Sequence, residues 1–516
     1  MPVLEGDMTA ARSLLHPFLF GLYLVLSLAA SNAAELGSWT DLVWPIGASL
    51  LIAGICWLAG FAVSRQPQKA ALIGLLWFIA FSIYGYVAET LRDVGTIGLI
   101  GHEPGLGLLF VVALVGPSLA IRRTARRLEP VNRYLSIVAL LLLGYTTLQL
   151  CLVIWRDGGS PAVLAPPSAR PKPPVADEGP DIHLIILDKY TGSEVLKEHF
   201  GFDNREFEGF LRSRGFIVPK SAQANYPLTL LALASMLNLD YVQNLPRQSN
   251  LFNVIENNRL AEFLKLRGYR FAFFPTGYRL TAENRTADVE LVHPKSIMSE
   301  FASAWVVTTM LPELVDGACA LAGCEAGRVL ARAQDAEIMD WKFERIKDLA
   351  GGDSPTFVLA HLMLPHEPYL YRADCSHRDP YWPPGHGLLG DAAATRGYLD
   401  QIRCANRKLA ALVDSILARS RRPPVILLQA DHGHGRLPEL PAREKVSPYR
   451  LRERMSVFSA YLVPGLKPES VPDSITPVNA VRLMLRQCFG AELPMLEDIG
   501  YWAPQDDPFD LTRIRY

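Results

Sequence analysis

The chain has 516 residues, of which 50% are hydrophobic, and a formal net charge of −1. This length exceeds what one ordinary hydrophobic core accommodates, and the apolar content is too high for a wholly soluble protein. A small soluble single-domain protein is therefore excluded.

The apolar residues are concentrated before about residue 156. Five runs there, nearly free of charge, approach the roughly 20 residues that a membrane helix needs: residues 13–30, 43–63, 70–88, 106–121 and 134–155. We predict a bundle of five transmembrane helices over residues 1–156. Two alternatives are five buried helices of a soluble protein and a signal peptide over the first run.

Basic residues in the short loops predict the orientation of these helices, because such loops stay in the cytoplasm. Arg65 and Lys69 lie between the second and third runs, and five arginines lie between the fourth and fifth: Arg122, Arg123, Arg126, Arg127 and Arg133. The chain after Trp155 is then expected outside the cytoplasm. Because the arginine cluster is enclosed between two membrane spans, we expect no nucleic-acid partner.

Residues 157–180 are rich in Pro and Ala, which predicts a semi-rigid linker. Over residues 181–516, short β-rich runs alternate with helical patterns, which predicts an α/β domain with a largely parallel central sheet. The predicted strands include "IHLIIL", "YRFAFF", "TFVLA", "PVILLQA" and "FSAYLVP".

Five cysteines lie beyond the linker, and an odd number leaves at least one thiol unpaired within the chain. In an exported domain we expect disulfides Cys319–Cys324 and Cys375–Cys404, with Cys488 free. A zinc cluster on Cys319 and Cys324 is an alternative, although no second closely spaced pair accompanies them.

Three predicted strands are followed by Asp or His residues, whose side chains can bind a metal ion or transfer a proton. "IHLIIL" is followed by Asp188, "TFVLA" by His361 and then His366, and "PVILLQA" by Asp431 and His432. The carboxyl ends of parallel strands face one crevice, so these side chains are expected to meet there. Asp188, Asp431 and His432 could hold a divalent cation and leave a position open for substrate.

Thr229 is the candidate nucleophile. Pro227 favours a helix start, and the apolar sequence after Thr229 continues as a helix. A hydroxyl at a helix N-terminus lies in a field that favours an alkoxide and a phosphorylated intermediate. Structural explanations stay open: Thr229 as a helix cap, Asp188 as a turn residue and His361 as a core histidine.

The order of these motifs resembles the alkaline phosphatase/sulfatase superfamily, specifically the membrane-anchored branch of lipoteichoic acid synthases and lipid A phosphoethanolamine transferases. The resemblance covers about residues 181–465, and it implies a sulfatase-like α/β/α domain outside the membrane. By position, it implies that Asp188, Thr229, Asp431 and His432 bind one metal ion (Zn, Mn or Mg). It also makes Thr229 the covalent nucleophile, and His366 or His361 a contact for substrate phosphate or the acid for the leaving group.

The resemblance further implies a multi-pass protein of the bacterial inner (cytoplasmic) membrane with a periplasmic catalytic domain. The expected reaction transfers a phosphoethanolamine- or phosphoglycerol-type headgroup from a membrane phospholipid donor to an envelope glycan or lipid acceptor. A membrane-anchored phosphatase or phosphodiesterase is the alternative enzyme, and a catalytically silent lipid-binding protein is the alternative outside enzymes.

The chain departs from the superfamily in two ways. It lacks a Cys or Ser in the C/S-x-P-x-R motif of sulfatases, so sulfate ester hydrolysis is not expected. For a second metal ion it offers only His434 and His366, so one tightly held ion is expected.

Overall fold

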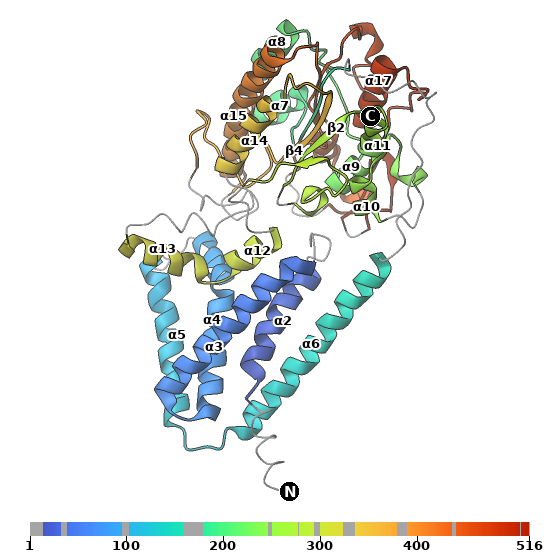
Figure 1. The fold of residues 1–516 in the computed structure, drawn as a ribbon. Coiled ribbons are helices and arrows are strands. Elements are labelled where there is room, and N and C mark those ends of the chain that lie inside the picture. Colours follow the sequence, from blue (N-terminus) through green and yellow to red (C-terminus); the bar gives the residue numbers. More distant parts are fainter. Residues whose placement is uncertain are drawn as a thin grey trace. The chain divides into compact units, whose positions relative to one another are not determined.

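The computed structural model describes residues 14–31, 39–94, 103–157, 179–245, 250–276, 278–293, 300–322, 336–378, 390–435, 440–505 and 507–514. The chain divides into two compact units (Figure 1). The first, which we call the helical unit, comprises Met1–Gly158 and Ile297–Ala333. The second, the sheet unit, comprises Gly159–Ser296 and Gln334–Tyr516.

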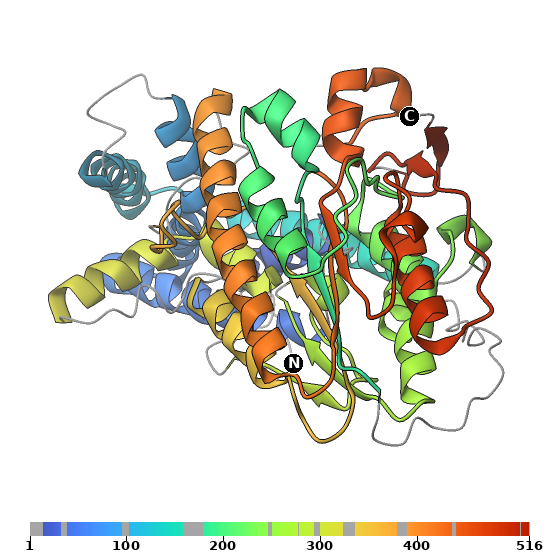
Figure 2. The ribbon, with the colours of Figure 1, turned by 90° about the horizontal axis from the view of Figure 1, so that it is seen from above.

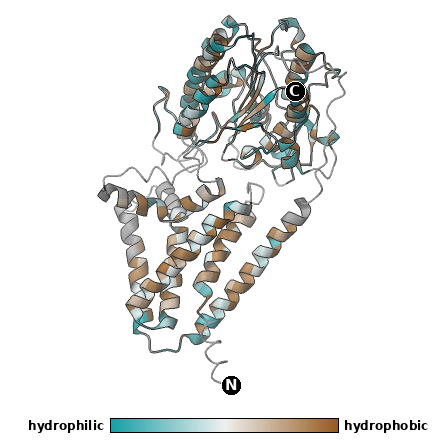
Figure 3. Cartoon of the chain, in the orientation of Figure 1, coloured by the Kyte–Doolittle hydropathy of each residue, from teal (hydrophilic) through white to brown (hydrophobic). Residues whose placement is uncertain are grey.

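The apolar runs of the helical unit fall in helices, although the helix of the first run begins only at His16, and most described residues of these helices have the colour of hydrophobic residues in Figure 3. These helices are α2 (His16–Ser31), α3 (Val43–Ser64), α4 (Pro67–Val94), α5 (Glu103–Arg123) and α6 (Glu129–Asp157). Within the described ranges, three helical segments are long and apolar enough to cross a membrane: Thr40–Ser64, Pro67–Val87 and Glu129–Leu152. Helix α2 is shorter, at 16 residues, and α5 contains Pro117. The count of five spans therefore stays a prediction.

The sheet unit is built on a six-stranded sheet with the order β3-β2-β4-β1-β5-β6. All neighbouring pairs are parallel except β5 with β6. The predicted largely parallel sheet is thus present. Its strands are β1 (Ile182–Leu187), β2 (Arg270–Phe274), β3 (Val289–Glu290), β4 (Thr356–Leu362), β5 (Val425–Ala430) and β6 (Ser459–Leu462).

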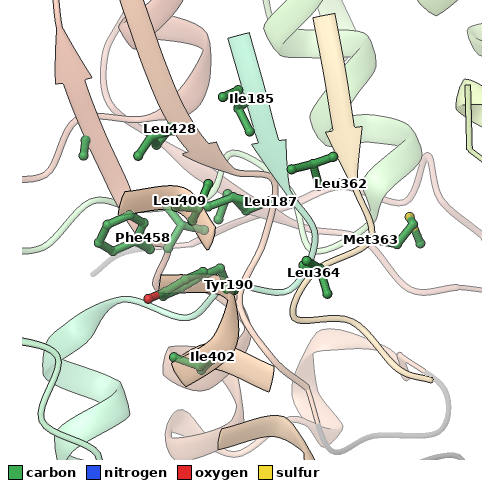
Figure 4. Close-up of a cluster of buried hydrophobic side chains, with 14 of the residues drawn as sticks. Ile185, Leu187, Tyr190, Leu362, Met363, Leu364, Ile402, Leu409, Leu428 and Phe458 are labelled. Carbon is green, nitrogen blue, oxygen red and sulfur yellow. The ribbon is translucent and has the colours of Figure 1, made fainter. Parts of the chain in front are cut away.

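Helices cover both faces of this sheet, because alternate residues of the buried strands point to opposite faces and both sets are apolar. Ile185 and Leu187 of β1 pack with Leu428 of β5 and Leu409 of α15 (Figure 4). Helices α15 and α17 lie on opposite sides of the strands (Figure 2). The first face holds α7 (Ser193–Phe200), α8 (Arg205–Ser213), α14 (Ala336–Asp348) and α15 (Gly390–Arg419); the second holds α9 (Thr229–Asn238), α10 (Leu251–Glu256), α11 (Arg259–Lys265) and α17 (Pro477–Phe489).

The remaining elements include a small antiparallel sheet of β7 (Gly500–Trp502) and β8 (Thr512–Ile514), and helix α16 (Pro448–Met455) before β6. The sequence assigned all of residues 181–516 to one domain, whereas residues 297–333 belong to the helical unit. They carry α12 (Glu300–Thr308) and α13 (Leu311–Ala322). Apart from residues 157, 179 and 180, the predicted linker at 157–180 lies outside the described residues.

One expected disulfide is present, between Cys375 and Cys404, with a Cα–Cα distance of 5.0 Å. It attaches the loop after β4 to α15. Cys488 is a free thiol, as expected. The Cys319–Cys324 pair lies outside the residues whose side chains the structure describes.

Candidate active site and metal centre

Two acids follow neighbouring strands at the same level of the sheet. Leu187 of β1 pairs with Ala430 of β5, and the next residues are Asp188 and Asp431. Their side chains therefore begin at adjacent points of the carboxyl edge, as expected for parallel strands. Both side chains are buried.

The turn after β1 fixes one oxygen of Asp431. Lys189 adopts a φ of 63°, a left-handed conformation that is uncommon outside glycine. In this turn, the Lys189 backbone N–H donates to Asp431 Oδ1 at 3.3 Å, and the His432 backbone N–H donates to the same oxygen at 2.7 Å. The second oxygen, Oδ2, lies 3.3 Å from Nε2 of His432.

Thr229 is the first residue of α9, and the extended backbone of Leu228 precedes it. Its Oγ1 lies 3.0 Å from Nε2 of His432. On the other side of the ring, Nδ1 lies 3.0 Å from the carbonyl oxygen of Gly433. Because a carbonyl oxygen only accepts, the ring proton belongs on Nδ1, and Nε2 offers a lone pair to the Thr229 hydroxyl or to a metal ion.

The glycine after His432 is required by a close approach of two backbones. A Cβ at Gly433 would lie 2.2 Å from the carbonyl oxygen of Glu453 and 2.5 Å from that of Ser456. The Gly433 N–H donates to the carbonyl oxygen of Arg454 at 2.7 Å. The segment between α16 and β6 is thereby held against the end of β5.

Asp188, Asp431 and His432 together form a candidate metal centre. Each offers one ligand atom, and these atoms lie within 4.8 Å of one another. Among the residues that the structure describes, two buried carboxylate oxygens, Asp188 Oδ1 and Asp431 Oδ2, have no hydrogen-bond partner. Such oxygens are costly to bury unless a cation balances them, and two carboxylates with an imidazole suit a divalent metal ion. The residues therefore fit the predicted ion.

The pKa values of the three candidate ligands are shifted in different directions by burial and by their neighbours. Burial and then the charge of Asp188 raise the pKa of Asp431 to about 7. Burial also acts to raise the pKa of Asp188, but the nearby His366, His361 and His432 outweigh it and hold this pKa below its usual value. Burial and the positive charge of Arg454 lower the pKa of His432 well below its ordinary value. Without a bound cation, burial and the neighbouring Asp188 therefore disfavour the ionised form of Asp431.

His361 contacts the side chain of Asp188 from the neighbouring strand β4. The sequence placed it at the end of its strand, but β4 continues through Leu362, and His361 pairs with Ile186 inside the sheet. Its Nε2 lies 3.3 Å from Asp188 Oδ2, and its Nδ1 lies 3.0 Å from Thr281 Oγ1. Because both ring nitrogens face protein groups and the side chain is fully buried, His361 orients the carboxylate.

His366 lies in the loop after β4, close enough to Asp188 for its charge to lower the pKa of that carboxyl. The Gln401 side chain of α15 donates to the carbonyl oxygen of His366 at 2.6 Å. Burial and the charge of Lys189 lower the pKa of His366 itself. His366 therefore lies near the candidate metal centre, on a loop that is hydrogen-bonded to α15 through Gln401.

Three charged residues of the site were missed by sequence reasoning. Lys189 Nζ forms a buried ion pair with Glu367 Oε1 at 2.6 Å. The guanidinium of Arg454 donates through Nε to the carbonyl oxygen of Pro227 at 2.7 Å, and its Nη2 lies 3.2 Å from His432 Nε2. No motif marks Arg454; only its place shortly before a predicted last strand could have pointed to it.

His434 lies outside the metal centre. Its backbone N–H donates to Thr191 Oγ1 at 2.7 Å, and its ring stacks on Tyr398 with a centroid distance of 4.2 Å. Across the described ranges, the cluster of Asp188, Asp431 and His432 is the one group of three or more candidate ligands.

No protein-family model matches the sequence, and no curated protein matches it either. Among solved structures, the chain is similar to the C-terminal periplasmic domain of EcEptC from Escherichia coli, at 12% identity and a TM-score of 0.43, over 68% of this chain and 96% of that chain. It is also similar to the integral membrane lipooligosaccharide phosphoethanolamine transferase A (EptA) from Neisseria meningitidis, at 12% identity and a TM-score of 0.41, over 93% of this chain and 95% of that one. A third is the putative sulfatase yidJ from Bacteroides fragilis, at 13% identity and a TM-score of 0.40, over 67% and 85%. Since all three TM-scores are below 0.5, the function proposed next rests on the side chains of this chain.

Proposed function

We propose that the protein is a metal-dependent enzyme that transfers a phospho-headgroup, of phosphoethanolamine or phosphoglycerol type, from a membrane phospholipid to an envelope glycan or lipid. The observation that carries this proposal is the position of the Thr229 hydroxyl. It lies at the N-terminus of α9, 3.0 Å from His432 Nε2, beside two buried carboxylates that each have one oxygen without a hydrogen-bond partner among the described residues. A hydroxyl in such surroundings is set up to become a nucleophile.

Asp188, Asp431, His432 and Thr229 would hold one divalent cation, Zn, Mn or Mg. When bound, the cation supplies positive charge that favours the ionised form of Thr229 and balances the phosphoryl oxygens. The Nδ1–H bond from His432 to Gly433 keeps Nε2 unprotonated, which suits a ligand atom.

In the first half-reaction, Thr229 Oγ1 forms a bond to phosphorus, and the bond from phosphorus to the lipid alcohol oxygen breaks. The departing oxygen takes a proton from the imidazolium form of His366, and the Thr229 proton passes to solvent. Arg454 lies 3.2 Å from His432 Nε2, so its guanidinium can bind a non-bridging phosphoryl oxygen where negative charge builds up.

In the second half-reaction, an acceptor hydroxyl attacks the phosphothreonine and gives its proton to His366. Thr229 leaves from phosphorus and regains a proton from solvent. Transfer and hydrolysis share the first half-reaction and differ only in whether a glycan, a lipid or water supplies this hydroxyl.

The membrane helices support a lipid donor, because an anchored enzyme meets a substrate that is confined to the bilayer. Three helical segments of the described chain have the length and apolarity of membrane spans. We place the protein in the bacterial cytoplasmic membrane as a multi-pass protein, with residues 181–296 and 334–516 in the periplasm.

The test uses the purified full chain, loaded with metal, and vesicles of phosphatidylethanolamine or phosphatidylglycerol. Intact mass spectrometry should find one adduct, whose mass identifies the headgroup and whose peptide contains Thr229, together with released diacylglycerol. Addition of a glycan or lipid acceptor should then transfer the headgroup from Thr229 to the acceptor. Loss of the adduct to water alone would assign the protein as a hydrolase, and absence of both adduct and diacylglycerol with either lipid would overturn the proposal.

A further inference from the structure

The segment between β3 and α14 leaves the sheet unit and joins the helical unit. Residues 297–333 belong to the helical unit, while the residues before and after them belong to the sheet unit. The chain therefore passes between the units three times, at residues 158–159, 296–297 and 333–334. The predicted linker accounts for only the first of these connections.

Helix α12 buries one face against the membrane helices. Its side chains Phe301, Trp305 and Val306 are at most 5% exposed. They form one apolar cluster with residues of α2, of α6 and of the 3-10 turn Trp39–Leu42: Val25, Ala29, Leu42 and Leu150. The Trp305 ring also meets the Trp44 ring of α3 edge to face, with a centroid distance of 5.6 Å. This contact is a packed apolar interface.

The end of α12 approaches α4 at backbone distance. The Met310 N–H donates to the carbonyl oxygen of Phe81 at 2.9 Å. A Cβ at Gly85 would lie 1.9 Å from the carbonyl oxygen of Val307. Because glycine has no Cβ, Gly85 allows the backbone at Val307 to pack directly against α4.

The contacted ends of the membrane helices share one side of the bundle. The segment meets the second half of α2, the start of α3, the second half of α4 and the end of α6. The basic loops lie at the opposite ends, where Lys69 Nζ donates to the carbonyl oxygen of Arg122 at 2.9 Å. By the basic-residue rule, the contacted ends are the extracytoplasmic ones.

We propose that residues 300–322, which carry α12 and α13, are a docking element by which the exported domain binds non-covalently to the extracytoplasmic ends of its own membrane helices. The element shortens the tether. The linker up to Asp181 could extend over ~80 Å, whereas the ten residues from Glu290 to Glu300 span at most ~36 Å. A shorter tether raises the effective concentration of the domain at the bilayer. This inference is independent of the reaction proposed above.

The experiment cuts the linker and asks whether the two fragments stay together. A protease site is inserted between Pro167 and Ser168 of the full chain, which carries an affinity tag at its N-terminus and is purified in detergent. After cleavage, the C-terminal fragment should remain bound to the tagged membrane fragment. Release of most of it from the wild-type protein would overturn the proposal.

Two variants alter the interface from opposite sides. The double substitution Trp305→Ala with Val306→Asp, and separately Gly85→Val in α4, should each reduce the retained fraction at least tenfold after cleavage. Val307→Ser is the matched control, because the Val307 side chain is 54% exposed on the same helix; its retention should equal that of the wild type. Gly85→Val leaves the exported domain unchanged, so it keeps the test decisive if the α12 variant fails to fold.

A lipid surface is the competing partner. The isolated C-terminal fragment, recovered after cleavage of the Gly85→Val variant, is mixed with vesicles that contain no membrane fragment. The proposal expects the fragment to stay in solution. Binding to the vesicles, with the affinity seen for the tagged membrane fragment, would assign the surface to lipid and overturn docking on the helices.

Discussion

The Thr229 hydroxyl and Nε2 of His432 lie 3.0 Å apart, although 203 residues separate them in the chain. Thr229 begins a helix on one face of the sheet, and His432 follows strand β5, which lies between β1 and the edge strand β6. The pair places a candidate nucleophile on the candidate metal centre.

Replacing Thr229 tests its role as the nucleophile. We expect Thr229→Ala to lower kcat/KM by about three orders of magnitude or more, because the group that forms the covalent bond is removed. Thr229→Ser keeps a hydroxyl and should retain a measurable fraction of the activity. Steady-state release of diacylglycerol from vesicles measures both. An Ala variant within tenfold of the wild type would remove Thr229 from this role.

Metal removal should destabilise the wild-type protein through its buried acids. Chelation removes the ion that would balance the charge of Asp188 and Asp431, so the apo protein should melt at a lower temperature than the metal-loaded one. Asp431→Asn should lower the bound metal measured by elemental analysis, and its melting temperature should respond little to chelator. Unchanged metal content in both Asp431→Asn and His432→Ala would place the metal elsewhere.

Arg454 should contribute to the reaction through its charge. We expect Arg454→Met to lower kcat about a hundredfold, as for loss of one group that stabilises transition-state charge, and Arg454→Lys to recover part of it. Bound metal should change little, because Arg454 supplies no ligand atom. Because Arg454 Nε also bonds to Pro227, a thermal melt must accompany the kinetics. If the Arg454→Met and Arg454→Lys variants both remain folded and have the same kcat, the positive charge of Arg454 has no role in the reaction.

His183 should make the sheet unit sensitive to acid. Its side chain is fully buried in β1, both ring nitrogens lack hydrogen-bond partners among the described residues, and burial lowers its pKa to about 4. Since the unfolded chain binds the proton first, the free energy of unfolding should fall as the pH drops from about 6.5 to 4, by about 3 kcal/mol in all. Above pH 6.5 this residue should have no effect.

The variant His183→Leu isolates that contribution. The difference in unfolding free energy between wild type and variant should be constant above pH 6.5 and should shift in favour of the variant at lower pH. Parallel pH profiles for the two proteins would show that His183 does not titrate between the folded and unfolded states.

The disulfide Cys375–Cys404 should stabilise the sheet unit and keep the His366 loop in place. It closes a loop of 29 residues, for which the chain-entropy estimate is about 3–4 kcal/mol. Reductant or the double substitution Cys375→Ser with Cys404→Ser should lower the melting temperature and the activity together, because Gln401 of α15 bonds to the His366 carbonyl. Cys488→Ser is the control and should change neither.

The sequence by itself determined the local features of this protein. Apolar runs long enough for membrane helices, buried strands and a helix start at Thr229 are all set by residues close together in the chain, so their patterns are visible without a structure. The proximity of Asp188, Asp431 and His432 was predicted in the same way, because parallel strands bring their carboxyl ends to one edge whatever their order in the sheet.

Tertiary structure alone decided the rest. Arg454 reaches His432 because Gly433 lets the segment before β6 approach the end of β5, and Lys189 meets Glu367 across two loops. The position of α12 on the membrane helices depends on the fit of Trp305 and on the gap at Gly85. These are pairwise contacts between residues far apart in the chain, and they depend on shape complementarity, which hydrophobic periodicity does not encode.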